Sequence, residues 1–120
     1  MSETIDSTSI LESIKRLLGI SPYDDGFDGE IKDQINAEFL TLHQLGIGPA
    51  NGFSITGPDD VWTDYTDNTK LIDAVRQFIY LRVRLVFDPP ASSVISDAIN
   101  NRISELEFRL NIQAEGDAES

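Results

Sequence analysis

Apolar residues recur every three or four positions over four stretches of the chain, the spacing of helices that each turn one face to a core. The first two stretches cover residues 10–18 and 28–45, and the last two cover residues 69–87 and 92–111. Only residues 53–56 alternate in the manner of a short strand or arm. The sequence therefore predicts an all-α fold, a small bundle of about four helices.

Residues that start and stop helices stand at the edges of the first two stretches. Ser9 and Glu12 fit a capping box, and Gly19 is placed to end the first helix. Asp28 is placed to cap the second helix, and Gly46 to close it. The expected inward faces are Ile10, Leu11, Ile14, Leu17 and Leu18 in the first helix and Ile31, Ile35, Phe39, Leu42 and Leu45 in the second.

A double proline separates the last two helices and predicts a C-terminal helical hairpin. Pro89 and Pro90 lack an amide donor, and Pro89 disfavours helical geometry at the residue before it. The third helix is apolar around more than half of its circumference, so it is either central in its own bundle or covered by a neighbouring subunit. We interpret the wide apolar arc of the third helix as a surface that neighbouring subunits cover. The fourth helix has a narrow seam for one partner helix: Ile95, Ile99, Ile103, Leu106 and Leu110.

Residues 46–67 form a long irregular segment in the middle of the chain, rich in glycine and proline. A loop of about twenty residues is long for a small domain and is usually functional or mobile. Its apolar side chains stand among aspartates, and they either fold back onto the core or meet another subunit. The candidate residues for a subunit or portal interface are Phe53, Ile55, Val61, Trp62 and Tyr65.

The length of 120 residues indicates one domain over residues 1–120, with polar ends at 1–8 and 112–120 that we expect to be flexible. The chain has no cysteine, which excludes disulfides, thiolate metal sites and cysteine nucleophiles. It also has no apolar run long enough for a bilayer and no basic-then-apolar leader. We therefore expect a soluble protein that is not secreted and has no membrane partner.

The net charge of −12 is unevenly distributed. Residues 1–67 carry thirteen acids and three bases, whereas residues 68–111 carry five acids and six bases. A surface this acidic repels the phosphates of nucleic acids. We therefore expect no sequence-specific nucleic-acid binding. The acids either keep the protein soluble or form a face for a basic partner or for a passage through which DNA slides.

One arginine stands out in the third helix. Arg82 lies near the centre of the apolar arc, where an unpaired charge would be costly. Glu38 lies near the middle of the inward face of the second helix and is the expected partner. The sequence thus predicts a structural ion pair between Glu38 and Arg82, formed either within the chain or across a subunit boundary.

Residues suited to catalysis or metal binding are sparse. His43 has no second histidine or cysteine at ligand spacing and is expected at the surface. Residues 24–29 resemble a calcium loop only loosely, because the acids do not alternate and no glutamate follows at the twelfth position. There is no glycine-rich phosphate loop and no serine with a plausible base. We predict no catalytic residue, no metal and no cofactor, and hence no enzyme.

Two runs carry a family resemblance: Tyr-Leu-Arg-Val-Arg-Leu-Val-Phe-Asp-Pro-Pro at 80–90 and Glu-Leu-Glu-Phe-Arg-Leu at 105–110. The opening at 14–20, the Asp-Gly-Phe-Asp run at 25–28 and the loop around Trp62 agree in order and spacing. In these features the chain resembles the head–tail connector proteins of long-tailed bacteriophages, also called head-completion or adaptor proteins.

The resemblance implies a structural protein of the virion, made in the host cytoplasm, that acts at the head–tail junction. It implies a homo-oligomeric ring, usually dodecameric, beneath the portal protein, which extends the DNA channel and receives a stopper or tail-completion protein. It also implies that the middle loop and the stretch after Asn111 contact neighbours or the portal. Two alternatives from other classes are an acidic DNA mimic that inhibits a host nucleic-acid enzyme and a bacterial helical adaptor with a peptide groove.

Overall fold

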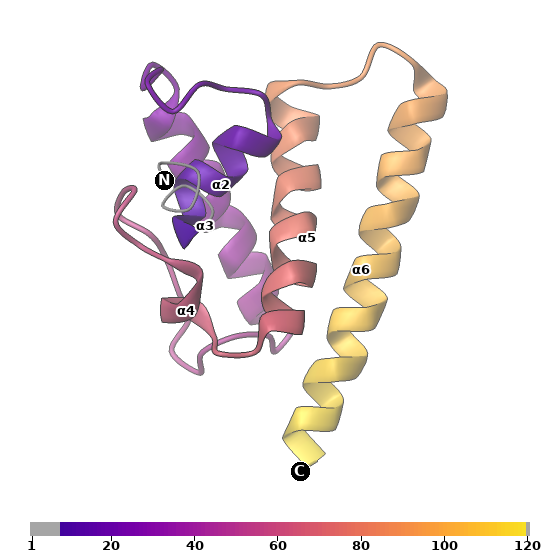
Figure 1. Cartoon of the computed structure of the whole chain (residues 1–120). Helices are drawn as coiled ribbons and strands as arrows, with labels where there is room; N and C mark the ends of the chain where they lie inside the picture. The colour runs from indigo at the N-terminus through magenta and orange to yellow at the C-terminus, as the bar shows by residue number, and fades with distance from the viewer. Residues whose placement is uncertain (1–7, 120) are drawn as a thin grey trace.

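The computed structural model describes residues 8–119, in which helices are joined by loops (Figure 1). Apart from one isolated antiparallel bridge between Ser9 and Val61, these residues form no strand. The all-α prediction is confirmed, as is the hairpin formed by the last two helices. In chain order the helices are α2 (Ile10–Leu17), α3 (Asp28–Gln44), α4 (Trp62–Tyr65), α5 (Thr69–Phe87) and α6 (Ser93–Glu119).

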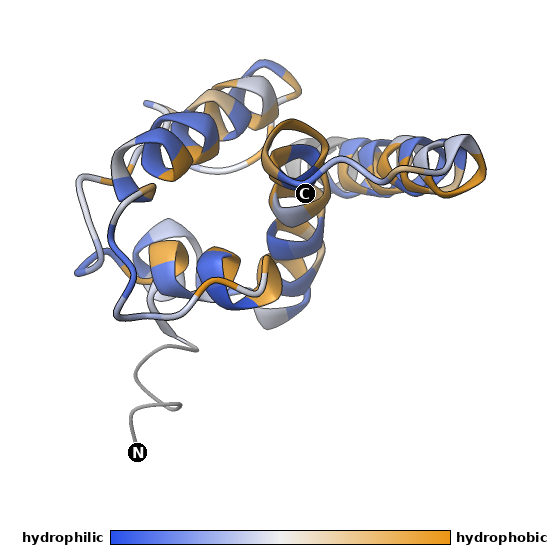
Figure 2. Cartoon of the chain, turned by 90° about the horizontal axis from the view of Figure 1, so that it is seen from above, coloured by the Kyte–Doolittle hydropathy of each residue, from blue (hydrophilic) through white to orange (hydrophobic). Residues whose placement is uncertain are grey.

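Helix α5 lies at the centre of the molecule. It contacts α2 and α3 on one side and α6 on the other, and Figure 2 shows α6 extending sideways from it. Its wide apolar arc is therefore covered largely by its own chain, and the interpretation that neighbouring subunits must cover it is wrong. The buried residues of α5 are Leu71, Ile72, Val75, Phe78, Ile79, Leu81 and Val83.

Helix α2 begins where the sequence predicts, with the Ser9 hydroxyl accepting a hydrogen bond from the Glu12 amide at 3.2 Å. Its inward face differs in one respect. Leu17 is 42% exposed, whereas Lys15 is buried. The ammonium of Lys15 lies 2.8 Å from a carboxylate oxygen of Asp28, the first residue of α3. Asp28 thus serves as an ion-pair partner between two helices rather than as the predicted cap.

The predicted inward residues of α3 from Ile31 to Leu42 are buried. Leu45, the last of the predicted set, is only partly buried. The loop after α3 returns across this helix, where the Asn36 side chain both accepts from the amide of Ile55 at 2.7 Å and donates to its carbonyl at 3.0 Å. Further along, the Asp60 carboxylate accepts from Thr56 and Gly57. The pKa of Asp60 lies below its ordinary value, chiefly because the Thr56 amide donates a hydrogen bond to the ionised carboxylate. The segment at 53–56 is an ordered loop, not a strand.

Helix α6 packs against α5 along the predicted seam, with Ile99, Ile103, Leu106 and Leu110 buried. Ile95 is 48% exposed because the two helices diverge toward the proline connection (Figure 1). The Arg102 guanidinium ties the helices together by donating to the Gln77 side chain at 2.7 and 3.1 Å. Helix α6 continues to Glu119, past the expected end at Asn111, and its end projects beyond the bundle (Figure 1). Of the ends expected to be flexible, residues 1–7 lie outside the described residues.

We expect Gly48→Ala to destabilise the protein by about 2 kcal/mol or more. Gly48 has a φ of +95°, and an added Cβ would lie 2.6 Å from the Tyr65 hydroxyl oxygen. Because Tyr65 is buried, its ring has little room to move. Gly19→Ala is the matched control, since Gly19 has a φ of +82° but open space around it. Urea denaturation measures both, and an equal loss in the two variants would refute the steric argument.

Candidate functional site

The apolar side chains of the middle loop are mostly part of this chain's own core. Ile55, Trp62 and Tyr65 are 2%, 3% and 5% exposed, and Phe53 and Val61 are half-buried. The rings of Phe53 and Tyr65 each lie with their centroids 5.0 Å from that of Phe39 on α3. The loop residues therefore fold back onto the core, the first of the two alternatives left open by the sequence.

Trp62 is held in place from two sides. Its indole Nε1 donates to the Ser13 hydroxyl on α2 at 3.1 Å, and the Arg76 guanidinium on α5 lies 5.9 Å from the ring centroid. A side chain held in this way stays within the core of its own subunit. An interface role for the loop stays a prediction, and it applies to the exposed positions beside Trp62.

The two residues assigned to an ion pair lie in contact within the chain. Arg82 Nε donates to Glu38 Oε1 at 2.5 Å, and Gln34 donates to the other carboxylate oxygen at 2.8 Å. Glu38 is buried, whereas the Arg82 side chain is 36% exposed and its guanidinium lies 5.5 Å from the ring centroid of Phe78. Arg82 thus reaches outward past its apolar neighbours, and the group that needs compensation is the buried carboxylate.

The structure does not gather the remaining titratable residues into a chemical site. Among residues 8–119, no group of histidines and carboxylates is arranged to hold a metal ion. No helix in the same part of the chain is long and apolar enough to cross a membrane. His43 is exposed, as the sequence predicted, and the Asp24 carboxylate accepts a hydrogen bond from the Gly26 amide in a turn.

An unpaired surface on α6 is the feature that the sequence reasoning missed. Phe108 is 65% exposed and Ile112 is 51% exposed, one turn apart on the side opposite the buried seam. Val94, 75% exposed, continues this side near the start of the helix. The sequence contained evidence for this second apolar side, because Phe108 and Ile112 are spaced one helical turn apart but do not belong to the seam. A helix with apolar residues on two opposite faces suits contacts with two partners.

We expect Arg82→Met to cost about 2 kcal/mol, because it leaves the Glu38 carboxylate buried with one fewer charge-assisted hydrogen bond. Adding Glu38→Gln should recover part of this loss, since the second change removes the uncompensated charge. Glu105→Gln breaks an exposed pair with Arg102 and should cost less than about 1 kcal/mol. Urea denaturation of the two single variants and the double variant gives the coupling energy, and strict additivity would contradict the pairing.

Burial raises the pKa of Tyr65 to about 12. The folded chain then keeps this phenol neutral where the unfolded chain, with an ordinary value of 10.0, has begun to ionise. Stability is therefore complete below about pH 10 and falls as the pH rises toward 12.

Tyr65→Phe should remove this contribution to the alkaline loss, measured as the urea midpoint at several pH values. Near pH 8 the substitution should cost little, because the Tyr65 hydroxyl is buried without a hydrogen-bond partner in the described structure. Tyr23→Phe is the control at a site that is 91% exposed. Identical pH profiles for Tyr65→Phe and the parent protein would count against the assignment.

Comparison with known proteins gives one match. The family model described as phage connector protein matches residues 10–117, which include α2 to α5 completely and most of α6. No curated protein and no solved structure matches the chain. The match agrees with a structural role joining phage head and tail, and it gives no support to an acidic DNA mimic. Because the match covers most of its length, the chain belongs to the phage connector protein family.

Proposed function

We propose that this connector assembles as a closed ring, dodecameric in the virion, on the portal protein at the head–tail junction. The ring extends the DNA channel and presents a docking surface for a stopper or tail-completion protein. The observation that carries the proposal is the unpaired side of α6, which leaves Phe108 and Ile112 exposed on a subunit whose own core is complete. Exposed apolar groups of this kind mark protein–protein contacts.

The projecting end of α6 is where we place the contact with the portal. The helix runs to Glu119, and Figure 1 shows its last turns beyond the rest of the bundle. Within the described residues no other helix lies beside these last turns, and such a helix end can enter a groove of another protein. The subunit would then contact its neighbours through the body of the bundle and the portal through this end.

The charge of the chain supports a channel rather than a DNA-binding role. Each chain carries a net charge of −12, so a ring of these subunits would repel the phosphates of DNA overall. DNA can pass such a surface without being retained by counterion release.

A phage carrying a stop codon in the gene for this protein tests the function. We expect DNA-filled heads without tails, and heads that lose DNA, because the portal channel has no extension for the tail to bind. Electron microscopy counts the tailed particles, and expression of the parent protein from a plasmid should restore them. Normal tailed, infectious particles in the absence of the protein would overturn the proposal.

Native mass spectrometry of the parent protein mixed with the isolated portal provides the second measurement. The expected complex carries several copies of this chain on each portal ring, in a ratio that approaches one to one. A portal that binds no copy at all would contradict the assembly role.

A further inference from the structure

We propose that the α6 outer face of one copy docks on the α4 edge of the next copy, and that this head-to-tail contact builds the ring. The α6 outer face is the side formed by Phe108, Arg109 and Ile112. The α4 edge is the side formed by Asp59, Val61, Thr63, Asp64 and Asp67. The inference rests on the proposed function, and it names the surfaces and the partner, a second copy of this chain.

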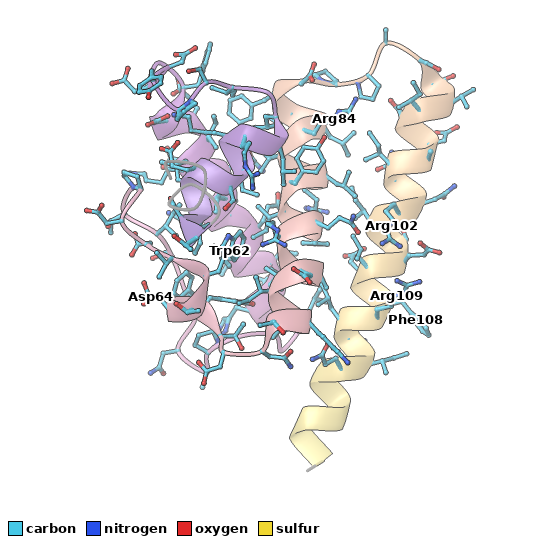
Figure 3. All side chains as sticks on the ribbon, in the orientation of Figure 1. Trp62, Asp64, Arg84, Arg102, Phe108 and Arg109 are labelled. Carbon is cyan, nitrogen blue, oxygen red and sulfur yellow. The ribbon has the colours of Figure 1, made fainter. Side chains whose placement is uncertain are left out.

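The α6 outer face combines two exposed apolar side chains with a positively charged side chain. Phe108 and Ile112 lie one helical turn apart, and both are more than half exposed. Arg109 lies beside them and makes no ion pair or side-chain hydrogen bond within the described residues. By contrast, Arg102 on the same helix is occupied by Gln77 and Glu105. Figure 3 shows Phe108 on the side of α6 that faces away from α5, with Arg109 next to it on the same helix.

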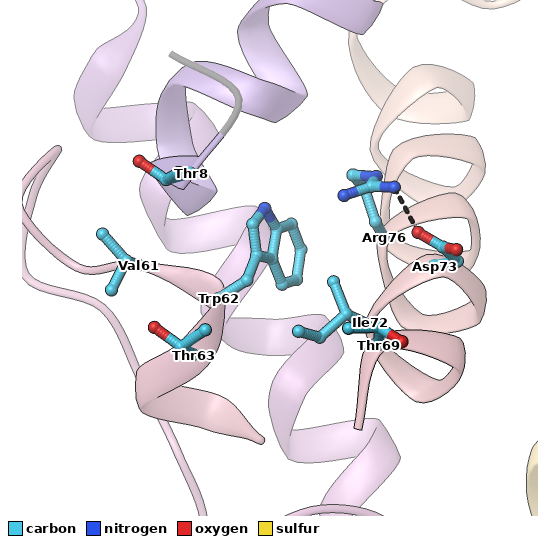
Figure 4. A pocket seen from close by; sticks show the side chains of 8 residues that line it. All are labelled: Thr8, Val61, Trp62, Thr63, Thr69, Ile72, Asp73 and Arg76. Carbon is cyan, nitrogen blue, oxygen red and sulfur yellow. Dashed lines mark hydrogen bonds and ion pairs between the residues drawn. The ribbon is translucent and has the colours of Figure 1, made fainter. Parts of the chain in front are cut away.

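The α4 edge places carboxylates beside a pocket that is lined by apolar side chains, by threonines and by the Asp73–Arg76 ion pair. The pocket has a volume of about 300 Å³, and Figure 4 shows Val61, Trp62 and Ile72 among its lining. Thr63 and Asp64 are exposed at this edge, and the Asp64 carboxylate makes a single described hydrogen bond, to the Val61 amide. Asp59 and Asp67 are also exposed, and neither has a described ion pair. An apolar side chain followed by a cation fits this arrangement.

The positions of the two surfaces favour a repeating contact. In Figure 3, Asp64 lies at one side of the molecule, and Phe108 and Arg109 lie at the other. A contact between two different surfaces of identical subunits leaves one surface free at each end, so copies continue to add, and they form a ring where the rotation between subunits closes. Pairing two α4 edges would instead place carboxylates against carboxylates, which is unfavourable.

Cysteine cross-linking tests the contact directly, because the chain contains no cysteine of its own. Ser104→Cys lies one turn before Phe108 at an exposed position and leaves Phe108 and Arg109 in place. Thr63→Cys introduces the partner thiol on the α4 edge. A short bismaleimide is applied to each variant alone and to their mixture, at high protein concentration and again on the isolated portal.

A head-to-tail contact gives cross-linked dimers in the mixture and none from either variant alone. The double variant should give a ladder of oligomers that ends at the closed ring. Arg109→Glu should lower the yield roughly tenfold at low salt, since it places an acid against the acidic edge. Arg16→Glu makes the same change of charge at an exposed site outside both surfaces and should leave the yield unchanged.

Several results would overturn the inference. Ser104→Cys cross-linking to itself would show a symmetric pairing of α6 helices. A mixture yield no higher than that of Ser104→Cys with Tyr23→Cys, a highly exposed site in the loop before α3, would show no specific contact. Equal cross-linking yields for Arg109→Glu and Arg16→Glu would show that charge complementarity does not contribute to the contact. If the Thr63→Cys and Ser104→Cys variants bind the portal together but give no cross-link there, these surfaces are rejected and the proposed function stays intact.

Discussion

The rest of the structure depends on the burial of α5. A helix that is apolar around more than half of its circumference must be covered on two sides, and this chain covers it with α2 and α3 on one side and α6 on the other. The connection through Pro89 and Pro90 makes this possible, because it ends α5 and lets α6 return along its open side. One consequence is that α6 uses only its seam inside the subunit. Its opposite side remains available for assembly.

Two ion pairs fix how α3 sits against its neighbours. Lys15 and Asp28 join α2 to α3, and Glu38 and Arg82 join α3 to α5. In each pair one member is almost fully buried, so moving either helix would leave a charge without its partner in a dry environment. Apolar packing alone allows helices to slide past one another at small cost. These pairs favour a single alignment of the three helices, and with it the position of the α4 edge relative to α6.

The sequence predicted those features that depend on local periodicity and on strong start and stop residues. Spacing and the double proline predicted α5, the break at Pro89–Pro90 and the seam of α6. The Glu38–Arg82 contact follows from two charges on inward faces. The burial of Trp62 could not be predicted in this way. It depends on the path of the loop, which is set by hydrogen bonds such as those between Asn36 and Ile55. Lys15 was missed because a lysine is ordinarily expected to reach solvent, and its burial depends on how the start of α3 packs against α2.

A complete core within one subunit changes how assembly must work. Because α5 is covered by its own chain, folding does not require neighbours, and the α6 outer face contributes few apolar side chains to any contact. Interfaces of this kind are weak one at a time, since a small buried area barely offsets the entropy lost on association. A portal that binds several copies side by side raises their effective concentration and lets weak contacts form together. We therefore expect ring formation to depend on the portal, so that the ring forms at the head–tail junction rather than free in solution.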